Sequence, residues 1–185
     1  MSDTEPPRPE RLFIGVPLDD PARTAIRGKL PSALPGKAVP PENWHFTLRF
    51  LGATSAVTRD QIVRNLRSRS LGRRFSIHFS ELGAFPNARR ARILWVGVGR
   101  GEGRMSEIAA VAESVAQEAG FEAETRKFTA HLTIAKIHLP SNVAALLAQP
   151  ALNVEMDVDR IVIYRSRLGK GPARYEEVES FALRD

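Results

Sequence analysis

The apolar and polar residues along this sequence follow two different rhythms. Short runs rich in valine, isoleucine, leucine and phenylalanine, bounded by glycine, proline or charged residues, are typical of strands. Such runs occupy residues 11–18, 75–82, 92–98, 154–165 and 175–183, and the stretches at 42–52 and 126–137 have an extended pattern as well. Apolar residues three or four positions apart predict helices after Asp20, after Thr58, over 102–119, and from Ser141 to Pro150.

Several residues mark the expected ends of these helices. Asp20 followed by Pro21 is the arrangement of an N-cap residue with proline in the first turn. Thr58 and Gln61 have the spacing of a capping box. Gly120 stands where the C-terminal cap of the longest periodic segment belongs.

The order of the elements predicts an α+β fold. Strand, helix, strand, helix, strand, strand, helix, strand, helix, strand, strand is the pattern of that class, and strands that directly follow one another are expected to pair antiparallel. The 185 residues are enough to bury a sizeable core. We expect a flexible, polar and proline-rich tail over residues 1–9 and a single domain over residues 10–185.

Two stretches of the chain carry the same short frame. ENWHFTLRFLG contains His45 and Thr47, and RKFTAHLTIAKI contains His131 and Thr133, each pair separated and followed by an apolar residue. Residues i and i+2 of a strand project from one face, so each frame presents an imidazole beside a hydroxyl while the apolar residues face a core. Because one frame lies in each half of the chain, the sequence predicts a duplicated architecture with a cleft between two similar lobes.

Two imidazoles and two hydroxyls across a cleft suit the in-line displacement of an oxygen at a phosphodiester. A neutral imidazole can accept a proton from attacking water, and an imidazolium can give one to the leaving oxygen. Hydroxyl groups can donate to the non-bridging oxygens, where charge builds up. This chemistry needs no metal, and we expect no cofactor. The absence of cysteine excludes disulfides, thiolate nucleophiles and zinc–cysteine sites, and it fits a cytoplasmic protein.

The net charge of +6 is unevenly distributed. The segment from Arg59 to Arg104 holds eleven arginines and three acidic residues. Such a segment favours a polyanionic partner. Of the 27 basic residues 22 are arginine, which the codon bias of a GC-rich genome also produces, so the charge alone leaves nucleic-acid binding open.

Other residues near the two frames are candidates for substrate binding. By strict alternation Arg49 shares the face of His45 and can reach a phosphate; an exposed strand arginine is the alternative. Trp44 and Phe128 are candidates for stacking on a base, with core packing as their alternative role.

The N-terminal residues MSDTEPPRPE are polar and have no apolar run behind them. We therefore expect neither a signal peptide nor a membrane anchor, and no segment approaches the ~20 apolar residues that cross a bilayer. No membrane and no obligate protein partner is predicted.

Over nearly its whole length the chain resembles a known group of enzymes. The stretches that carry the likeness are RLFIGVPL, ENWHFTLRFLG, LGAFPNARRARILWVGV, FTAHLTIAK and IYRSRLGKGPARYEEV. They resemble the two-histidine (2H) phosphoesterase superfamily and, within it, the RNA 2′,3′-cyclic phosphodiesterases, once described as 2′-5′ RNA ligases. The resemblance implies a bilobal, pseudo-twofold α+β fold in which two mainly antiparallel sheets line a central cleft, with helices outside.

The resemblance also implies roles for particular residues. His45 matches the proton donor and His131 the proton acceptor in the opening of a 2′,3′-cyclic phosphate at an RNA end by water, which leaves a 2′-phosphomonoester. Two positions depart from the usual pattern: Ala130 stands in place of proline, and Lys136 in place of arginine. Lys136 is a candidate for phosphate binding, but strict alternation turns it away from the His131 face, so this role requires a bend in the strand.

The substrate stays open at this stage. The alternatives are a small cyclic nucleotide, a 2′-5′-linked oligonucleotide or ADP-ribose cyclic phosphate, with ligation through a 2′-5′ bond as a minor reverse reaction. A non-catalytic RNA-binding module that uses the basic segment is a further alternative.

Overall fold

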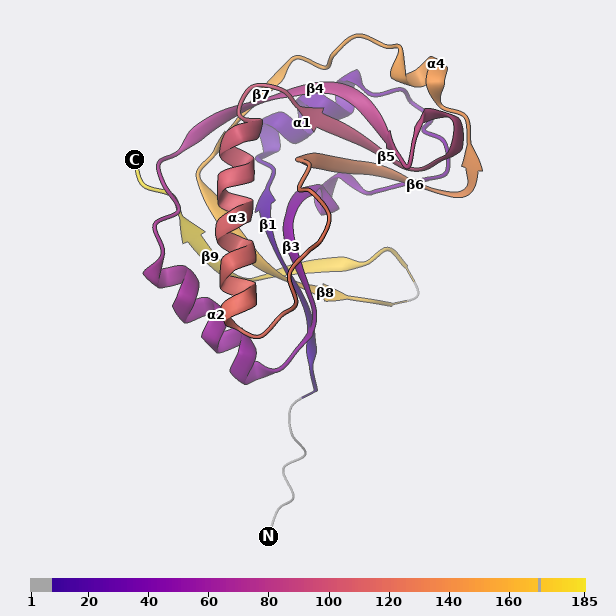
Figure 1. Cartoon of the computed structure of the whole chain (residues 1–185). Helices are drawn as coiled ribbons and strands as arrows, with labels where there is room; N and C mark the ends of the chain where they lie inside the picture. Colours follow the sequence, from indigo (N-terminus) through magenta and orange to yellow (C-terminus); the bar gives the residue numbers. More distant parts are fainter. Residues whose placement is uncertain (1–7, 170) are drawn as a thin grey trace.

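A computed structural model describes residues 8–169 and 171–185 of the chain (Figure 1). The described residues form nine strands: β1 (Glu10–Pro17), β2 (Lys37–Ala38), β3 (His45–Thr54), β4 (Phe75–Phe85), β5 (Ala91–Val98), β6 (His131–Ser141), β7 (Val154–Val158), β8 (Arg160–Arg167) and β9 (Arg174–Ala182). They also form four α-helices: α1 (Asp20–Lys29), α2 (Ala56–Ser68), α3 (Glu102–Glu118) and α4 (Ala144–Leu147). Two short 3₁₀ helices, η1 (Pro41–Asn43) and η2 (Ala88–Arg90), precede β3 and β5.

The strands form two curled antiparallel lobes that meet at one point. The strand order is β7-β4-β5-β6-β3-β1-β8-β9, with β2 paired to β6. We call β1, β3, β8 and β9 the first lobe, and β2 and β4–β7 the second lobe. The lobes are joined through β3 and β6, where Phe46 lies opposite Leu132 as the only paired position between these two strands in the described residues.

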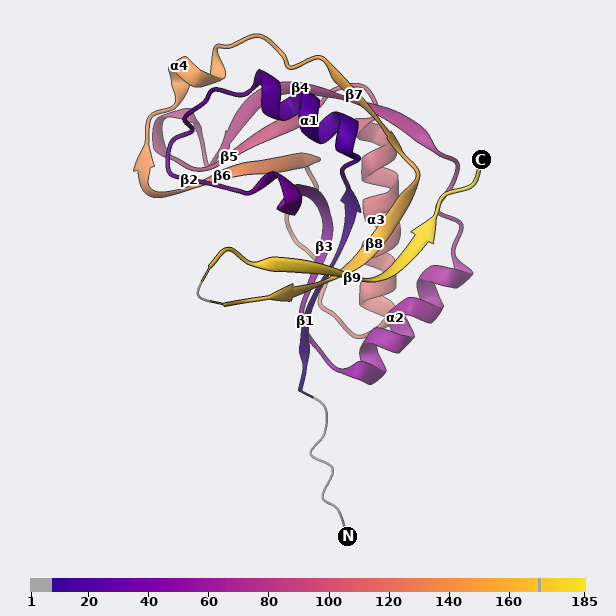
Figure 2. The same cartoon turned by 180° about the vertical axis from the view of Figure 1, so that it is seen from behind.

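Two helices pack on the lobe opposite to the strand that they follow in the sequence. The helix α3 follows β5 of the second lobe in sequence but packs on β3 of the first lobe, while α1 follows β1 of the first lobe and packs near β7 of the second. Figures 1 and 2 show α3 on one side of the β1–β3 pair and α1 over the strands of the second lobe. The helix α2 packs beside α3. Each lobe is therefore completed by a helix from the other part of the chain.

One apolar core runs through both lobes. Phe46 of β3 and Phe79 of β4 are fully buried, with ring centroids 5.6 Å apart. Leu132 of β6 and Met105 of α3 are buried in the same cluster. The core thus closes around the point where the two lobes meet.

The predicted α+β class with antiparallel sheets is confirmed. The two sheets differ from the expectation in being continuous through the Phe46–Leu132 pair. The predicted tail over residues 1–9 lies outside the described residues except for Arg8 and Pro9, which are exposed and have no regular structure. No helix of the described residues is long and apolar enough to cross a membrane.

Four local predictions were wrong. The N-cap of α1 is Asp19, whose carboxylate accepts from the Ala22 N–H at 2.7 Å, and the N-cap of α2 is Ser55 and not Thr58. Residues 154–165 form two strands separated at Asp159. Ser141 ends β6 and does not open a helix, because α4 begins only at Ala144. The capping errors have a common cause, because several neighbouring residues could cap each helix and only the backbone path selects one.

A close contact between β4 and β5 generates a prediction about stability. Gly83 lies opposite Trp95, and a Cβ atom at Gly83 would stand 2.2 Å from the indole ring. We expect Gly83→Ala to lower the free energy of unfolding by about 1–3 kcal/mol, because the ring must move. Urea denaturation measures this change.

Gly103→Ala is the matched control for this substitution. Gly103 lies in the first turn of α3 with no atom near its would-be Cβ, and alanine there should leave stability unchanged or raise it by up to about 1 kcal/mol. Equal denaturation midpoints for Gly83→Ala and the wild type would show that the ring contact is not a constraint.

Candidate active site

The two His-x-Thr frames lie side by side at the junction of the lobes. His45 and His131 are the first residues of β3 and β6. Because Phe46 pairs with Leu132 in antiparallel register, His45 comes beside Thr133 and Thr47 beside His131. All four polar side chains are partly exposed, whereas Phe46 and Leu132 are fully buried. The expected alternation of the two frames is therefore present.

A groove of about 340 Å³ opens beside the junction. It is lined by the four polar side chains of the frames, by β2 and the residues after it, and by residues of the β8–β9 hairpin. The hairpin lies below β6 and runs in the same direction as that strand (Figures 1 and 2). Five of its further lining residues are Lys37, Phe50, Lys136, Leu168 and Tyr175.

Both histidines are held in the same way. The Nδ1 atom of His45 lies 2.8 Å from the Asn43 carbonyl oxygen, and that of His131 lies 2.8 Å from the Thr129 carbonyl oxygen. A carbonyl only accepts, so Nδ1 carries the hydrogen in each ring and Nε2 is the nitrogen that gains or loses a proton. The Nε2 atom of His45 lies 3.1 Å from Thr47 Oγ1. Each ring thus has a fixed orientation with its titrating nitrogen identified.

Aromatic side chains pack around each imidazole. The His45 ring lies 4.6 Å from the Phe13 ring and 5.0 Å, edge-on, from the Tyr175 ring. The His131 ring lies 5.1 Å, edge-on, from the Phe85 ring, and Trp95 stands beside both. Both imidazoles are therefore confined by rings from neighbouring strands.

Phe13 and Trp95 belong to a second repeated frame, which was not predicted from the sequence. Phe13-x-Gly15 in β1 and Trp95-x-Gly97 in β5 are each followed by valine. Gly15 pairs with Thr47, and Gly97 pairs with His131. A Cβ atom at Gly15 would stand 2.7 Å from the Phe46 carbonyl oxygen. The signal in the sequence was the order aromatic, apolar, glycine, valine. It occurs once ahead of the His45 frame and once ahead of the His131 frame.

Each frame is followed by a β-bulge at the same position. In β3 the pairing with β1 passes from Thr47 to Arg49 without Leu48, and in β6 the pairing with β5 passes from Thr133 to Ala135 without Ile134. A bulge inserts one residue and shifts the alternation of the faces that follow. The fifth residue after each histidine therefore faces the groove.

Lys136 is brought to the groove by this bulge. It is exposed and lines the groove together with His131 and Thr133. The expectation that strict alternation turns Lys136 away was wrong, because the strand contains the bend that a phosphate contact requires. Phe50 occupies the equivalent place in the first lobe and is 60% exposed. Phe50 was not predicted as a groove residue, because the alternation of apolar and polar residues does not reveal the bulge that turns it toward the groove.

Arg49 is turned away from the groove by the bulge in β3. Its Nε lies 2.6 Å from Glu113 Oε2 of α3, and its Nη2 donates to the Glu122 carbonyl oxygen at 2.5 Å. Its side chain is only 12% exposed. The predicted phosphate contact of Arg49 is not supported, and the residue instead ties β3 to α3 and to the segment that leads into β6.

Trp44 and Phe128 belong to the core and not to the groove. Trp44 is 5% exposed, and its indole N–H donates to the Val39 carbonyl oxygen at 3.0 Å. Phe128 is half-buried against the core cluster. Neither ring lines the groove, so stacking on a base is not supported for either. Core packing was the alternative role, and it is the one that the contacts support.

Burial sets the charge state of one histidine. It lowers the pKa of His45 from 6.5 to about 4, opposed by the hydrogen bond to Asn43 and reinforced by the positive charges of His131 and Lys136. The His45 ring is therefore neutral at pH 7 in the free protein. A negative charge placed in the groove would act in the opposite direction.

Most of the basic segment is engaged in ion pairs. Six of its eleven arginines lie next to carboxylates: Arg59, Arg67, Arg69, Arg74, Arg100 and Arg104. Surface pairs of this kind contribute little stability each, but they neutralise the charge that favoured a polyanion. Within the described residues no cluster of three or more His, Asp or Glu side chains is placed to hold a metal ion.

The chain is similar to several known proteins. The LigT like Phosphoesterase family matches residues 16–95. An RNA 2′,3′-cyclic phosphodiesterase of Aeropyrum pernix is 39% identical over 63% of this chain and 65% of its own length. One of Methanothermobacter thermautotrophicus is 33% identical over 94% of this chain and 98% of its own length. The chain belongs to the LigT-like phosphoesterase family.

The LigT-like fold is supported by a solved structure. The crystal structure of E. coli LigT in apo form superposes with a TM-score of 0.82, covering 97% of this chain and 100% of that one at 24% identity. The resemblance predicted from the sequence is confirmed by these relatives, and the predicted enzyme class is the class for which they are named. The matched region spans just under two thirds of the Aeropyrum pernix LigT-like relative.

The lowered pKa of His45 generates a prediction for NMR titration. In the free protein the His45 ring should protonate with a midpoint near pH 4, while His45 in the unfolded chain has the ordinary value near 6.5. Inorganic phosphate should move the midpoint upward, because an anion in the groove favours the imidazolium. Ring ¹³C and ¹⁵N shifts measure both values. A free-protein midpoint near 6.5, or a midpoint that phosphate leaves in place, would contradict this account.

Proposed function

We propose that this protein hydrolyses 2′,3′-cyclic phosphate ends of RNA to 2′-phosphomonoesters. The observation that carries the proposal is the convergence of both His-x-Thr frames on one groove, where each imidazole is held by its Nδ1 atom and Nε2 is the nitrogen that can exchange a proton. The names of the relatives support the same reaction. RNA is the substrate class that those names state.

The proposed chemistry uses the two imidazoles in turn. Neutral His131 accepts a proton from water through Nε2 while the water oxygen forms a bond to phosphorus. The bond from phosphorus to the 3′ oxygen breaks, and protonated His45 gives its Nε2 proton to that oxygen. Thr47 and Thr133 donate hydrogen bonds to the non-bridging oxygens as charge builds on them. The 2′ oxygen keeps the phosphate.

This assignment requires His45 to gain a proton when substrate binds. The free protein holds the His45 ring neutral mainly through burial, and the charge of Lys136 adds to this effect. The anionic phosphodiester offsets that positive charge and so raises the pKa of His45. Substrate binding and protonation of the donor are therefore linked, and the linkage gives the general acid its proton only when a phosphate occupies the groove.

Phe50 is the proposed contact for the nucleobase. Its exposed ring lines the groove, which is also lined by the apolar side chain of Leu168 and the ring of Tyr175. An exposed aromatic ring is a suitable stacking surface for any base. Phe50 takes the role that the sequence had suggested for Trp44 and Phe128.

The finer alternatives remain part of the proposal. A small cyclic nucleotide, a 2′-5′-linked oligonucleotide or ADP-ribose cyclic phosphate would use the same two histidines, and product analysis on these compounds separates them. Ligation is the reverse of the same displacement and is expected to be minor. A cytoplasmic location stays a prediction. A non-catalytic RNA-binding module is disfavoured by the pairing of most basic-segment arginines with carboxylates.

The catalytic roles predict the behaviour of histidine variants. His45→Gln and His131→Gln should each lower kcat on an RNA with a 2′,3′-cyclic end by about 10²–10⁴-fold, because each removes one proton transfer. The double variant should lose less than the product of the two single losses, because the two residues act as a unit.

His78→Gln is the control for these variants, because His78 lies outside the groove and contacts Glu155. It should retain full activity. Full activity of either single groove variant would rule out the two-histidine mechanism.

The base contact predicts a loss of binding in Phe50→Ala. We expect KM for the same RNA to rise about tenfold with kcat nearly unchanged, since stacking on an aromatic ring contributes about 1–3 kcal/mol per base. Val57→Ala, which removes another exposed apolar side chain, is the control. An unchanged KM in Phe50→Ala would place the base elsewhere.

A further inference from the structure

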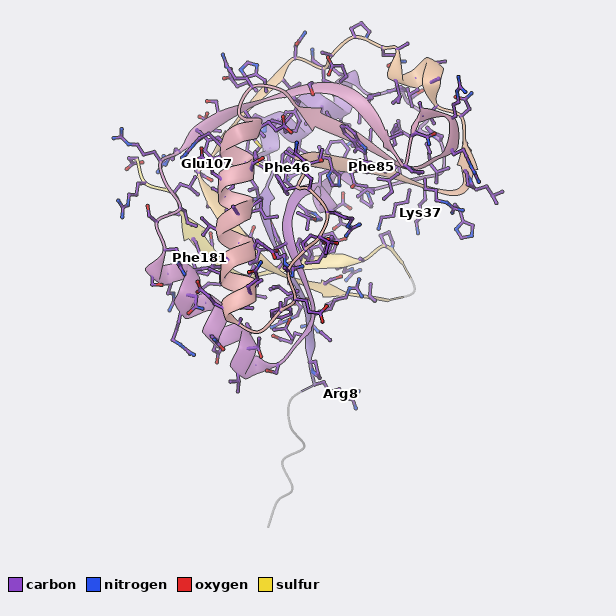
Figure 3. The ribbon with its side chains drawn as sticks, in the orientation of Figure 1. Arg8, Lys37, Phe46, Phe85, Glu107 and Phe181 are labelled. Atoms are coloured by element: carbon purple, nitrogen blue, oxygen red, sulfur yellow. The ribbon has the colours of Figure 1, made fainter. Side chains whose placement is uncertain are left out.

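The short strand β2 places a second lysine beside Lys136. Lys37 and Lys136 are directly opposite each other in the antiparallel pair of β2 with β6, and both line the groove. Figure 3 shows Lys37 on the side of the groove, between β6 and the β8–β9 hairpin. The groove therefore contains a pair of ammonium groups in addition to the four side chains of the two frames.

The backbone around β2 fixes this position closely. Gly36 has a φ of +81°, and a Cβ atom there would stand 2.5 Å from the Lys136 carbonyl oxygen. Just beyond β2, the Val39 N–H donates to the Ile134 carbonyl oxygen at 2.8 Å. Glycine at 36 thus permits the close approach of the two backbones. The register that places Lys37 opposite Lys136 is held from both ends of β2.

Like charges directly opposite each other on neighbouring strands destabilise a sheet. Neither lysine forms an ion pair with a carboxylate of the described part of the chain, although six arginines of the basic segment do. An arrangement of two unneutralised ammonium groups in a groove is the arrangement that an anionic ligand stabilises.

The two lysines differ in their relation to the histidines. Lys136 lies on the same strand as His131 and contributes to the lowered pKa of His45, whereas Lys37 lies on the neighbouring strand β2. The strand β6 pairs with β5 along one edge and with β2 along the other, so Lys37 and β5 lie on opposite sides of Lys136. Lys37 also precedes the loop that leads into β3. Along the groove the positive charge therefore continues beyond the reacting phosphate position.

We propose that Lys37, together with Lys136, binds the phosphodiester on the 5′ side of the terminal nucleotide. The inference rests on the proposed function and specifies its substrate class: an RNA end has this second phosphate, and a mononucleoside 2′,3′-cyclic phosphate has none. Lys37 is then a specificity residue that selects an RNA chain over a free cyclic nucleotide, without taking part in the proton transfers.

The test compares kcat/KM on three substrates. They are adenosine 2′,3′-cyclic phosphate, a diadenosine with a 2′,3′-cyclic end and a natural linkage, and the same diadenosine with a neutral methylphosphonate linkage. We expect Lys37→Met to lower the ratio of kcat/KM for the natural dinucleotide to that for the mononucleotide about tenfold. In the wild type, replacing the natural linkage by the neutral one should lower the same dinucleotide-to-mononucleotide ratio by a similar factor. With the neutral dinucleotide, Lys37→Met should cause no further decrease in that ratio.

Lys29→Met is the matched control, because Lys29 is exposed at the end of α1 and does not line the groove. It should leave the ratio unchanged, and Lys37→Arg should restore most of the loss. An unchanged ratio in Lys37→Met, or a loss that persists with the neutral linkage, would overturn the proposal.

Failure of the proposed function is recognised separately. A wild-type protein inactive on all three substrates would refute the reaction, and the second phosphate site is then decided by calorimetric binding of the 2′-phosphate products. The dinucleotide product should bind about tenfold more tightly than adenosine 2′-phosphate, and Lys37→Met should abolish that difference. Equal affinities in the wild type would overturn the site.

Discussion

The groove depends on one cross-strand pair, Phe46 with Leu132. This pair joins the two lobes, and burial of both side chains fixes the register in which β3 meets β6. A shift by one residue would turn both imidazoles into the core and expose the two apolar side chains. Because the strands separate directly beyond the pair, space opens for a ligand beside the same side chains. Hydrophobic packing beneath the junction thus determines the polar geometry above it.

The two lobes are similar in the strands that carry the histidines, but they differ in one side chain that faces the groove. Both strands present histidine, then threonine, then a bulge, and the next side chain that faces the groove is Phe50 in one lobe and Lys136 in the other. The shared part supplies one imidazole and one hydroxyl from each lobe. The differing part provides an aromatic surface on one side and a cation on the other, so the two ends of the groove are chemically distinct.

The sequence was sufficient for those features that follow from simple periodicity. The fold class, most elements and the face on which His45, Thr47, His131 and Thr133 lie all follow from period-two alternation and helical spacing. Alternation fails after a bulge, because the inserted residue is set by strand curvature and not by side-chain type. Arg49 was therefore assigned to the groove and Lys136 away from it.

Other groove residues could not be found locally. Tyr175 reaches His45 from a strand 130 positions later in the chain, and Lys37 is placed by a two-residue strand with little pattern of its own. Trp44 directly precedes His45, yet burial decides its role and adjacency does not. The pattern of residues does not reveal the strand order, and it is the strand order that brings these distant segments together.

The strand order also determines when the groove can form during synthesis, because strands from both ends of the chain are neighbours. β1 needs β8 as its neighbour, and the ring of Tyr175 that confines His45 arrives with β9, almost at the end of the chain. α3 must likewise be made before the outer side of β3 is covered. A nascent chain that already contains both histidines therefore lacks one wall of the groove. Under the proposed function, the protein therefore acts on RNA ends only after its last strand has left the exit tunnel of the ribosome.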